Sequence, residues 1–307
     1  FFCFFVMVRP TLSAVKPVTN QPISPSVLKE QNKTHSCTPL EKYNTEPKYF
    51  QVGATGSLYV GKEIHTGISV AIKVIPLKDK NYHQAFDNEV RILSSIKNSE
   101  FIVSLKDHFT HRGRGYIVME LLSQDLFTRS ETFETVEEVR HIFQQICQGV
   151  AELHQNRIAH LDLKPENVLV DEYDSIKICD FGSSFQWAND SRCYKHVGSD
   201  YYLAPEIFAH HRGYDAEKAD IWSLGIMLHF MLTNNFPFDG NSEKEILGNY
   251  FMSNISLKEL EVVCPDDVSC HALLSSMLHK NPEMRPSIMD VLQHEWFLNH
   301  IEELSFK

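Results

Sequence analysis

Hydrophobic and polar positions alternate in several segments of the first part of the chain. The segments with this period of two are 49–60, 69–76, 101–105 and 116–120. Turn residues separate them: His65-Thr66-Gly67 lies between the first two, and Arg112-Gly113-Arg114-Gly115 lies between the last two. Because strands joined by short turns pair with each other, this part of the chain predicts an antiparallel sheet.

Hydrophobic residues at steps of three and four predict helices in the other segments. A helix over 84–96 places Phe86, Val90 and Leu93 on one face. The remaining helical segments are 136–154, 216–232, 258–260, 269–278 and 287–294. The chain is therefore predicted to be rich in strands at first and mainly helical afterwards, which is an α+β architecture.

The first 48 residues show neither period. Residues 1–8 are apolar, but a membrane span takes about 20 apolar residues. No basic region and no Met precede this run, so we prefer an incomplete or wrongly assigned N-terminus to a targeting segment. Residues 9–48 are rich in Pro, Ser, Thr, Asn and Lys. We therefore predict that residues 1–48 form a disordered N-terminal segment.

Composition and charge exclude some classes of function. A hydrophobic content of 43% and a charged content of 22% in 307 residues fit a globular protein without a membrane span. The net charge of -11 argues against binding to nucleic-acid phosphates. Seven scattered cysteines without a CxxC pair indicate a reduced intracellular compartment, cytoplasmic or nuclear. Cys264, Cys270 and His271 could ligate a metal, but ordinary packing is the preferred interpretation.

One loop contains the candidate chemistry. The run His160-Leu161-Asp162-Leu163-Lys164-Pro165-Glu166-Asn167 brings together a carboxylate, an ammonium and a carboxamide. A second carboxylate, Asp180, follows Asp162 after eighteen residues and two short apolar runs. Phosphoryl transfer from a nucleotide needs a carboxylate for the proton of the attacking hydroxyl, a cation for the moving phosphoryl group and oxygen ligands for Mg²⁺.

This loop, with Asp180-Phe181-Gly182 and Ala204-Pro205-Glu206, closely resembles the catalytic loop and the DFG and APE segments of eukaryotic protein kinases. Lys164 and the run Gly198-Ser199-x-x-Tyr202 resemble the serine/threonine type. With Leu161 before Asp162, the catalytic loop resembles that of the myosin-light-chain-kinase and death-associated-kinase branch of the calmodulin-dependent kinase group.

The resemblance implies a bilobal α+β kinase fold, with a small, mostly antiparallel β N-lobe that contains one key helix and a larger, mainly helical C-lobe. The kinase domain would cover 49–298. Its parts would be an N-lobe of about 49–119, a hinge of 120–125 and a C-lobe of about 126–298, followed by a short tail of 299–307.

The resemblance also implies catalytic roles. Asp162 would orient and deprotonate the substrate hydroxyl, and Lys164 would meet the γ-phosphate of ATP. Asn167 and Asp180 would ligate Mg²⁺, with Mn²⁺ as the alternative. Lys73 would position the α- and β-phosphates, with Glu89, sixteen residues later, as its partner.

The remaining ATP-binding positions implied by the resemblance are Gln51, Gly53, Gly56, Leu58, Ala71, Met119, Glu120, Leu122, Asp125 and Leu169. Counted back from Lys73, the three glycines of the phosphate-covering loop fall on Gln51, Gly53 and Gly56, so the first glycine is missing. This departure weakens the expected affinity for nucleotide, although two glycines still let the backbone approach phosphate.

Other positions resemble supporting residues of the family. Asp220 matches an aspartate that braces the catalytic loop, and Arg285 matches the arginine that pairs with Glu206. The positions that resemble the regulatory spine are Leu93, Leu105, His160 and Phe181. Plain core packing would explain these four side chains equally well.

Two classes of function fit these residues. An active kinase would act on protein substrates, and we expect it to be a monomer. A pseudokinase would signal by conformation, but the complete set of Lys73, Glu89, Asp162, Asn167 and Asp180 favours the enzyme. Small-molecule phosphotransferases of similar fold lack an Ala-Pro-Glu segment.

Two further expectations concern substrate and regulation. Asp125 and Glu166 match carboxylates that bind arginines, so we expect Arg two or three residues before the target Ser or Thr; solvated surface charge is the alternative.

Leu161 replaces an arginine that binds a phosphorylated loop residue, and Lys195 replaces the phosphoacceptor. We therefore expect activity without loop phosphorylation, unless Ser191 or Tyr194 substitutes.

Overall fold

The computed structural model describes residues 39–52, 56–188, 192–208, 212–238, 245, 248–250, 255–265 and 267–298. The chain divides into two units, Phe1–Thr38 and Pro39–Lys307. Most of the predicted disordered segment, as far as residue 38, and the tail 299–307 lie outside the described residues.

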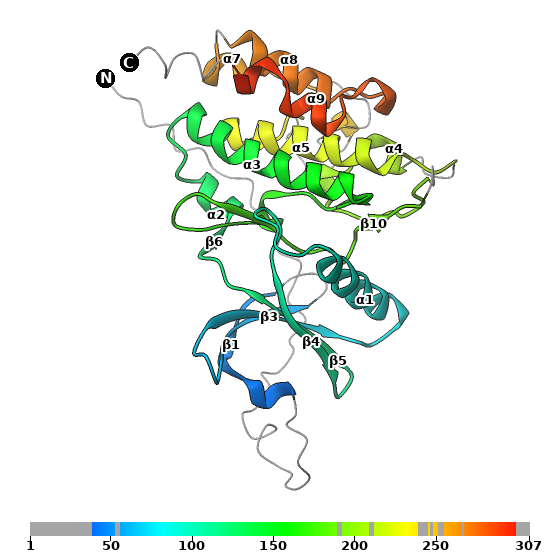
Figure 1. The fold of residues 1–307 in the computed structure, drawn as a ribbon. Helices are drawn as coiled ribbons and strands as arrows, with labels where there is room; N and C mark the ends of the chain where they lie inside the picture. The colour runs from blue at the N-terminus through cyan, green and yellow to red at the C-terminus, as the bar shows by residue number, and fades with distance from the viewer. Residues whose placement is uncertain are drawn as a thin grey trace, which may run out of the picture. The chain divides into compact units, whose positions relative to one another are not determined.

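The strands of the N-terminal part form one antiparallel sheet in the order β1-β2-β3-β5-β4 (Figure 1). Their bounds are β1 Tyr43–Val52, β2 Ser57–Glu63, β3 Ser69–Pro76, β4 Leu105–His111 and β5 Arg114–Glu120. The turn between β4 and β5 has positive φ at Arg112 (48°) and Gly113 (70°). A two-residue turn of this kind matches the twist of the strands that it joins.

The first strand begins earlier than the sequence predicts. A short 3₁₀ helix, η2, covers Pro39–Lys42, and β1 starts at Tyr43 instead of at 49. Tyr43 is 8% exposed and packs with Val70, Ile72 and Val118, and its hydroxyl donates to Asp107 at 3.3 Å. Residues 39–42 therefore belong to η2 and residues 43–48 to the sheet, and not to a disordered segment, because the sheet offers an apolar face that Tyr43 covers. The predicted strand 49–60 is two strands, because β1 ends at Val52 and β2 begins at Ser57.

The predicted strand 101–105 is wrong. Apart from Leu105, which begins β4, the segment forms only an isolated bridge between Ile102 and Ile178. Ile102 and Val103 are both buried at 2% exposure, so the side chains here do not alternate between two faces. The backbone of Val103 donates to Ile178 at 3.0 Å, and this contact ties the segment to the strands that flank the DFG residues.

One helix, α1, packs against this sheet and covers Lys80–Ser95. It begins four residues before the predicted start, because the Asp79 side chain accepts hydrogen bonds from the Asn81 and Tyr82 amides. Phe86, Ile92 and Leu93 lie on its buried face as the period of 3.6 requires, and Glu89 is buried with them. The burial of a carboxylate on an apolar helix face indicates a specific partner.

The C-terminal part is helical. Its longer helices are α3 Val136–Gln155, α5 Ala216–Thr233 and α8 Val268–Met277. Its shorter helices are α2 Leu126–Ser130, α4 Pro205–Phe208, α7 Leu260–Val263 and α9 Ile288–Leu292, and the prediction of 258–260 meets α7 only at residue 260. Helix α5 is almost wholly buried, and it contacts α3 and α8, while α9 packs on α3 (Figure 1). Within the described residues, no helix has both the length and the apolar character that a membrane span requires.

Short strands place the candidate catalytic segments. The strands are β6 Gln124–Asp125, β7 Ile158–Ala159, β8 Val168–Val170, β9 Ile176–Ile178 and β10 Phe185–Gln186. They pair in the orders β6-β8-β9 and β10-β7. Residues 160–167 connect β7 to β8, and residues 179–184 connect β9 to β10. Since β8 pairs with β9 and β10 pairs with β7, the two connecting segments lie beside each other.

Candidate active site

A fully buried aspartate fixes the start of the loop 160–167. Asp220, on α5, accepts hydrogen bonds from the amides of His160 and Leu161, both at 2.8 Å. His154 Nε2 donates to the same carboxylate at 2.9 Å. Leu161 adopts φ of 63°, a left-handed conformation that is uncommon for a side chain of this size. The carboxylate of Asp220 therefore stabilises a strained backbone turn just before Asp162.

The carboxylate of Asp162 is held at both oxygens. Oδ1 accepts from the Ser199 hydroxyl at 2.8 Å, and Oδ2 accepts from Asn167 Nδ2 at 3.0 Å. Lys164 Nζ donates to the Ser199 hydroxyl at 2.7 Å and lies 3.6 Å from Asp162 Oδ2. The side chain of Asp162 is thus oriented by three neighbours, and Ser199 bridges Asp162 and Lys164.

Lys73 lies between two carboxylates. Its Nζ donates to Glu89 Oε2 at 2.7 Å and to Asp180 Oδ1 at 2.8 Å. Burial alone would lower the pKa of Lys73, but Asp180 and Glu89 together raise it above its ordinary value, so the ammonium stays charged. Strand β3, helix α1 and the DFG segment, which are distant in sequence, are joined at this one ammonium.

The two carboxylates differ in how readily they ionise. Burial raises the pKa of Glu89 to about 7, although the Lys73 ammonium opposes this shift. Burial would also raise the pKa of Asp180, but the Lys73 ammonium keeps it below its usual range. The Lys73 ammonium therefore stabilises the ionised form of Asp180 against burial more fully than that of Glu89. Asp180 adopts a left-handed φ of 65°.

The residues expected to hold a divalent cation present suitable oxygen atoms. Asn167 uses its Nδ2 to donate to the Asp162 carbonyl at 2.7 Å and to the Asp162 carboxylate, which directs its amide oxygen elsewhere. Asp180 binds Lys73 through Oδ1 only. Carboxylate and amide oxygens are ligands that Mg²⁺ accepts, so this donor set fits the cation.

The alternative that Cys264, Cys270 and His271 ligate a metal is not supported. In the ranges that the structure describes, no group of three or more His, Cys, Asp or Glu side chains could hold a metal ion. Cys264 and Cys270 are buried, at 5% and 0% exposure, in the core around α7 and α8. Ordinary packing, the preferred interpretation, accounts for both side chains.

The candidate nucleotide positions gather along β2, β3, β5 and β8. Ala71 pairs with Met119 across β3 and β5, and both side chains are buried. Leu58 pairs with Lys73, and Leu169 pairs with Asp125, which also caps α2. Leu122 lies between β5 and β6, half-buried.

Backbone geometry explains Gly56 and Glu120. A Cβ on Gly56 would lie 2.4 Å from the Val74 carbonyl oxygen, so only glycine fits where β2 begins. Glu120 exchanges hydrogen bonds with Ser104, since its amide donates to the Ser104 carbonyl and its carboxylate accepts from the Ser104 amide. The backbone of Gln51 pairs with Leu58, whereas Gly53 lies outside the described residues.

The other supporting pairs are also in contact. The rings of His160 and Phe181 meet edge to face at 5.0 Å, and Leu93 is buried. Arg285 donates to Glu206 through both terminal nitrogens. Asn88 donates to the Phe181 carbonyl, and the Ser184 hydroxyl donates to the His160 carbonyl. No sequence pattern predicts these two contacts, because main-chain carbonyls are common to all residues.

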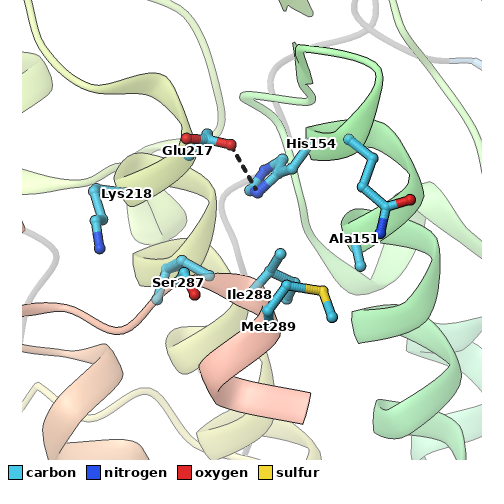
Figure 2. A pocket seen from close by; sticks show the side chains of 9 residues that line it. Ala151, His154, Glu217, Lys218, Ser287, Ile288 and Met289 are labelled. Carbon is cyan, nitrogen blue, oxygen red and sulfur yellow. Dashed lines mark ion pairs between the residues drawn. The ribbon is translucent and has the colours of Figure 1, made fainter. Parts of the chain in front are cut away.

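A cavity of about 200 Å³ lies apart from these residues, where α3, α5 and α9 meet (Figure 2). Its lining includes His154 and Gln155 of α3, Glu217 of α5 and Met289 of α9. Burial raises the pKa of Glu217, whose carboxylate lies 3.9 Å from His154 Nδ1. The hydrogen bond from His154 to Asp220 connects the lining of this cavity to the residue that fixes the loop 160–167.

Comparison with known families agrees with this arrangement. The protein kinase domain model matches residues 51–297. Calcium-dependent protein kinase 4 of Plasmodium berghei (strain Anka) is 31% identical over 261 residues, which are 80% of this chain and 47% of that protein. CBL-interacting serine/threonine-protein kinase 13 of Arabidopsis thaliana is 32% identical over 283 residues, 87% of this chain and 53% of that protein. Sperm motility kinase 2A of Mus musculus is 30% identical over 250 residues, 80% of this chain and 48% of that protein.

The chain therefore belongs to the protein kinase domain family. The expected α+β kinase fold, with a strand-rich N-lobe and a helical C-lobe, is confirmed. The chain spans about half the length of the curated relatives that it matches.

Proposed function

We propose that the protein is an ATP-dependent serine/threonine kinase that transfers the γ-phosphate of ATP to hydroxyl groups of protein substrates. The observation that carries this proposal is the position of Lys73 Nζ, 2.7 Å from Glu89 and 2.8 Å from Asp180. The names of the relatives, which include calcium-dependent and CBL-interacting kinases, support the same activity. Catalysis of this kind depends mainly on positioning and charge neutralisation.

Each side chain takes one role in this proposal. Asp162, oriented by Ser199 and Asn167, accepts the proton of the substrate hydroxyl. Lys164 neutralises charge on the γ-phosphoryl group, and Lys73 binds the α- and β-phosphates. Mg²⁺, or Mn²⁺ as the alternative, would neutralise phosphate charge when it is bound by Asn167 and Asp180.

We extend the proposal to basic substrates, because Glu166 carries a carboxylate oxygen that no donor of the described residues satisfies. Its Oε2 is buried and has no hydrogen-bond partner within the described part of the chain. Burial raises the pKa of Glu166, whereas its own backbone amide and the Lys164 ammonium oppose this shift and the Asp162 and Asp125 carboxylates add to it. An arginine of the substrate would relieve this cost, since its guanidinium binds carboxylates with two donors.

Peptide turnover tests this substrate preference. Peptides with Arg two or three residues before the target should show a kcat/KM about tenfold above matched Ala peptides, and Glu166→Gln should reduce the difference. Glu172→Gln, on the exposed turn between β8 and β9, is the matched control. Equal turnover of Arg and Ala peptides by the unmodified protein would refute the preference.

The alternative is a pseudokinase that binds nucleotide and signals by conformation. It rests on Gln51, which replaces the first glycine of the phosphate-covering loop. A radiolabelled ATP assay with a generic basic protein separates the two functions. We expect phosphate incorporation that depends on Asp162, and its absence at saturating ATP and Mg²⁺ would favour the pseudokinase.

The remaining parts of the proposal concern the state of the protein. We propose a monomer in the cytoplasm or nucleus that acts on proteins and not on nucleic acids. The scattered cysteines, which form no CxxC pair in the sequence, support a reducing compartment. Light scattering at micromolar concentration would test the monomer, and a mass of twice 35.4 kDa would contradict it.

A further inference from the structure

The segment directly after Asp180 is held by main-chain contacts from two directions. Asn88, on α1, donates through Nδ2 to the carbonyls of Phe181 at 3.0 Å and Ser184 at 2.8 Å. The buried hydroxyl of Ser184 donates to the His160 carbonyl at 3.1 Å. Helix α1 and the catalytic loop therefore both constrain the segment that carries Asp180.

A third constraint comes from Lys195, which lies further along the chain. Its Nζ donates to the Ser184 carbonyl at 2.7 Å and to the Ser183 carbonyl at 3.1 Å. Lys195 and Asn88 thus bind the same carbonyl oxygen of Ser184 from different elements. The ammonium links the chain that follows Asp180 to the chain that precedes Ser199.

The backbone of Lys195 is itself fixed. Cys193 and Tyr214 exchange two main-chain hydrogen bonds, each of 2.9 Å. The Tyr214 hydroxyl donates to the Lys195 carbonyl at 2.8 Å, and the Lys195 amide donates to Cys193 Sγ at 3.5 Å. Because Tyr214 is buried next to α5, the ammonium of Lys195 projects from a rigid support.

The contact is made by a charged donor in a partly desolvated position. Burial lowers the pKa of Lys195, Arg91 on α1 adds to this effect, and Cys193 opposes it. The partners of the Lys195 ammonium are the Ser183 and Ser184 carbonyl oxygens. Hydrogen bonds from a charged donor are about twice as strong as neutral ones. Their loss would leave the Ser183 and Ser184 carbonyls with fewer donors and would destabilise this conformation.

We propose that Lys195 is a positioning residue, whose ammonium orders residues 181–184 and thereby keeps Asp180 and α1 in the arrangement that joins Lys73, Glu89 and Asp180. This inference rests on the proposed kinase function, since the arrangement matters for catalysis only if phosphoryl transfer occurs. The Lys195 ammonium would then order this part of the chain without phosphorylation of a loop residue. A negative charge at residue 195 would face the Ser183 and Ser184 carbonyls and would be repelled.

Three substitutions and one control test the proposal. Lys195→Met keeps the length of the side chain without donors, Lys195→Arg keeps a charged donor, and Lys195→Glu reverses the charge. Lys97→Met, an exposed lysine after α1, controls for the loss of a surface charge. Hydrogen-exchange mass spectrometry of the purified full chain should follow the peptide that contains the Ser184 amide, which donates to Phe181 at 3.2 Å.

We expect Lys195→Met to speed exchange in this peptide and in the part of α1 that contains Asn88, and to lower kcat about tenfold with less than a twofold change in the KM for peptide. Lys195→Glu should lose more, Lys195→Arg should recover most of the protection, and Lys97→Met should match the parent protein. Unchanged exchange in Lys195→Met, or equal losses in Lys195→Met and Lys195→Arg, would overturn the proposal. Exchange does not require turnover, so absence of transferase activity in the parent protein would refute the kinase function alone.

Discussion

Arg285, just before α9, and Glu206 of the APE segment form a buried, bidentate ion pair. Arg285 Nη1 lies 2.6 Å from Glu206 Oε1, and Nη2 lies 2.9 Å from Oε2. Arg285 is 2% exposed, and its guanidinium stacks 4.9 Å above the Trp222 ring. Two residues 79 positions apart are thus joined in a geometry that a lysine could not reproduce.

The first prediction concerns this pair. Arg285→Gln should lower the free energy of unfolding by about 3 kcal/mol, because Glu206 would keep a buried charge without its partner. Arg192→Gln, an exposed arginine with one 3.3 Å contact to Gly213, should cost less than about 0.5 kcal/mol. Urea unfolding followed by fluorescence would measure both. Similar costs for the two variants would show that the ion pair contributes little.

The second prediction separates chemistry from folding at Asp162. Asp162→Asn should leave the unfolding midpoint nearly unchanged, because the amide is nearly isosteric with the carboxylate and its oxygen can still accept from the Ser199 hydroxyl. The variant should lose about 10³-fold in kcat, since the amide cannot accept the proton of the substrate hydroxyl. Lys73→Met should be equally inactive through loss of phosphate positioning. Half of the parent activity in Asp162→Asn would be incompatible with the assigned role.

The third prediction concerns activation. Protein expressed in bacteria and stripped by phosphatase should already be active, because Leu161 and Lys195 occupy the positions of a phosphate-binding arginine and its phosphoacceptor. Tyr194 is 62% exposed and accessible to a modifying kinase, and Ser191 lies outside the described residues. A tenfold rise in kcat on phosphorylation of either residue would show that phosphorylation beside Lys195 activates the protein.

The fourth prediction uses the ion pair of Arg129 and Asp174. Arg129 donates to both Asp174 oxygens, at 2.8 and 2.9 Å, and this hydrogen bonding holds the pKa of Asp174 below its ordinary value. A depressed carboxyl pKa stabilises the fold above the unfolded pKa, and the benefit is lost as pH falls through the folded pKa. Asp174→Asn should therefore cost up to about 1 kcal/mol at pH 7, since the pair is partly exposed.

The difference between Asp174→Asn and the parent protein should start to shrink near pH 4, where the carboxyl of the unfolded parent becomes protonated, and should vanish at lower pH, where the folded carboxyl is protonated as well. Denaturant midpoints of both proteins, measured from pH 7 downward, would give this profile. Asp171→Asn is not a suitable control, because its carboxylate accepts from Tyr173 and Ser175 amides, so Glu172→Gln serves instead. A difference that stays constant across this range would contradict an electrostatic origin.

Much of this protein followed from local features of its sequence. The helices over 136–154 and 216–232 were predicted to within one residue at each end, since a long apolar period specifies both the helix and its buried face. The two short apolar runs that follow the loop 160–167 in the sequence coincide with β8 and β9. These features depend on neighbours within a few residues, so they are visible without coordinates.

Other features were decided only by tertiary structure. The start of β1 depends on Tyr43 meeting Val70 and Val118, and the conformation of 101–104 depends on Ile178, far along the chain. The meeting of Lys73 with Asp180, 107 residues later, could be inferred from the family but not from any local pattern. The contacts of Asn88 and Lys195 are made to main-chain carbonyls, which every residue possesses, so no choice of side chain in the sequence identifies their partners.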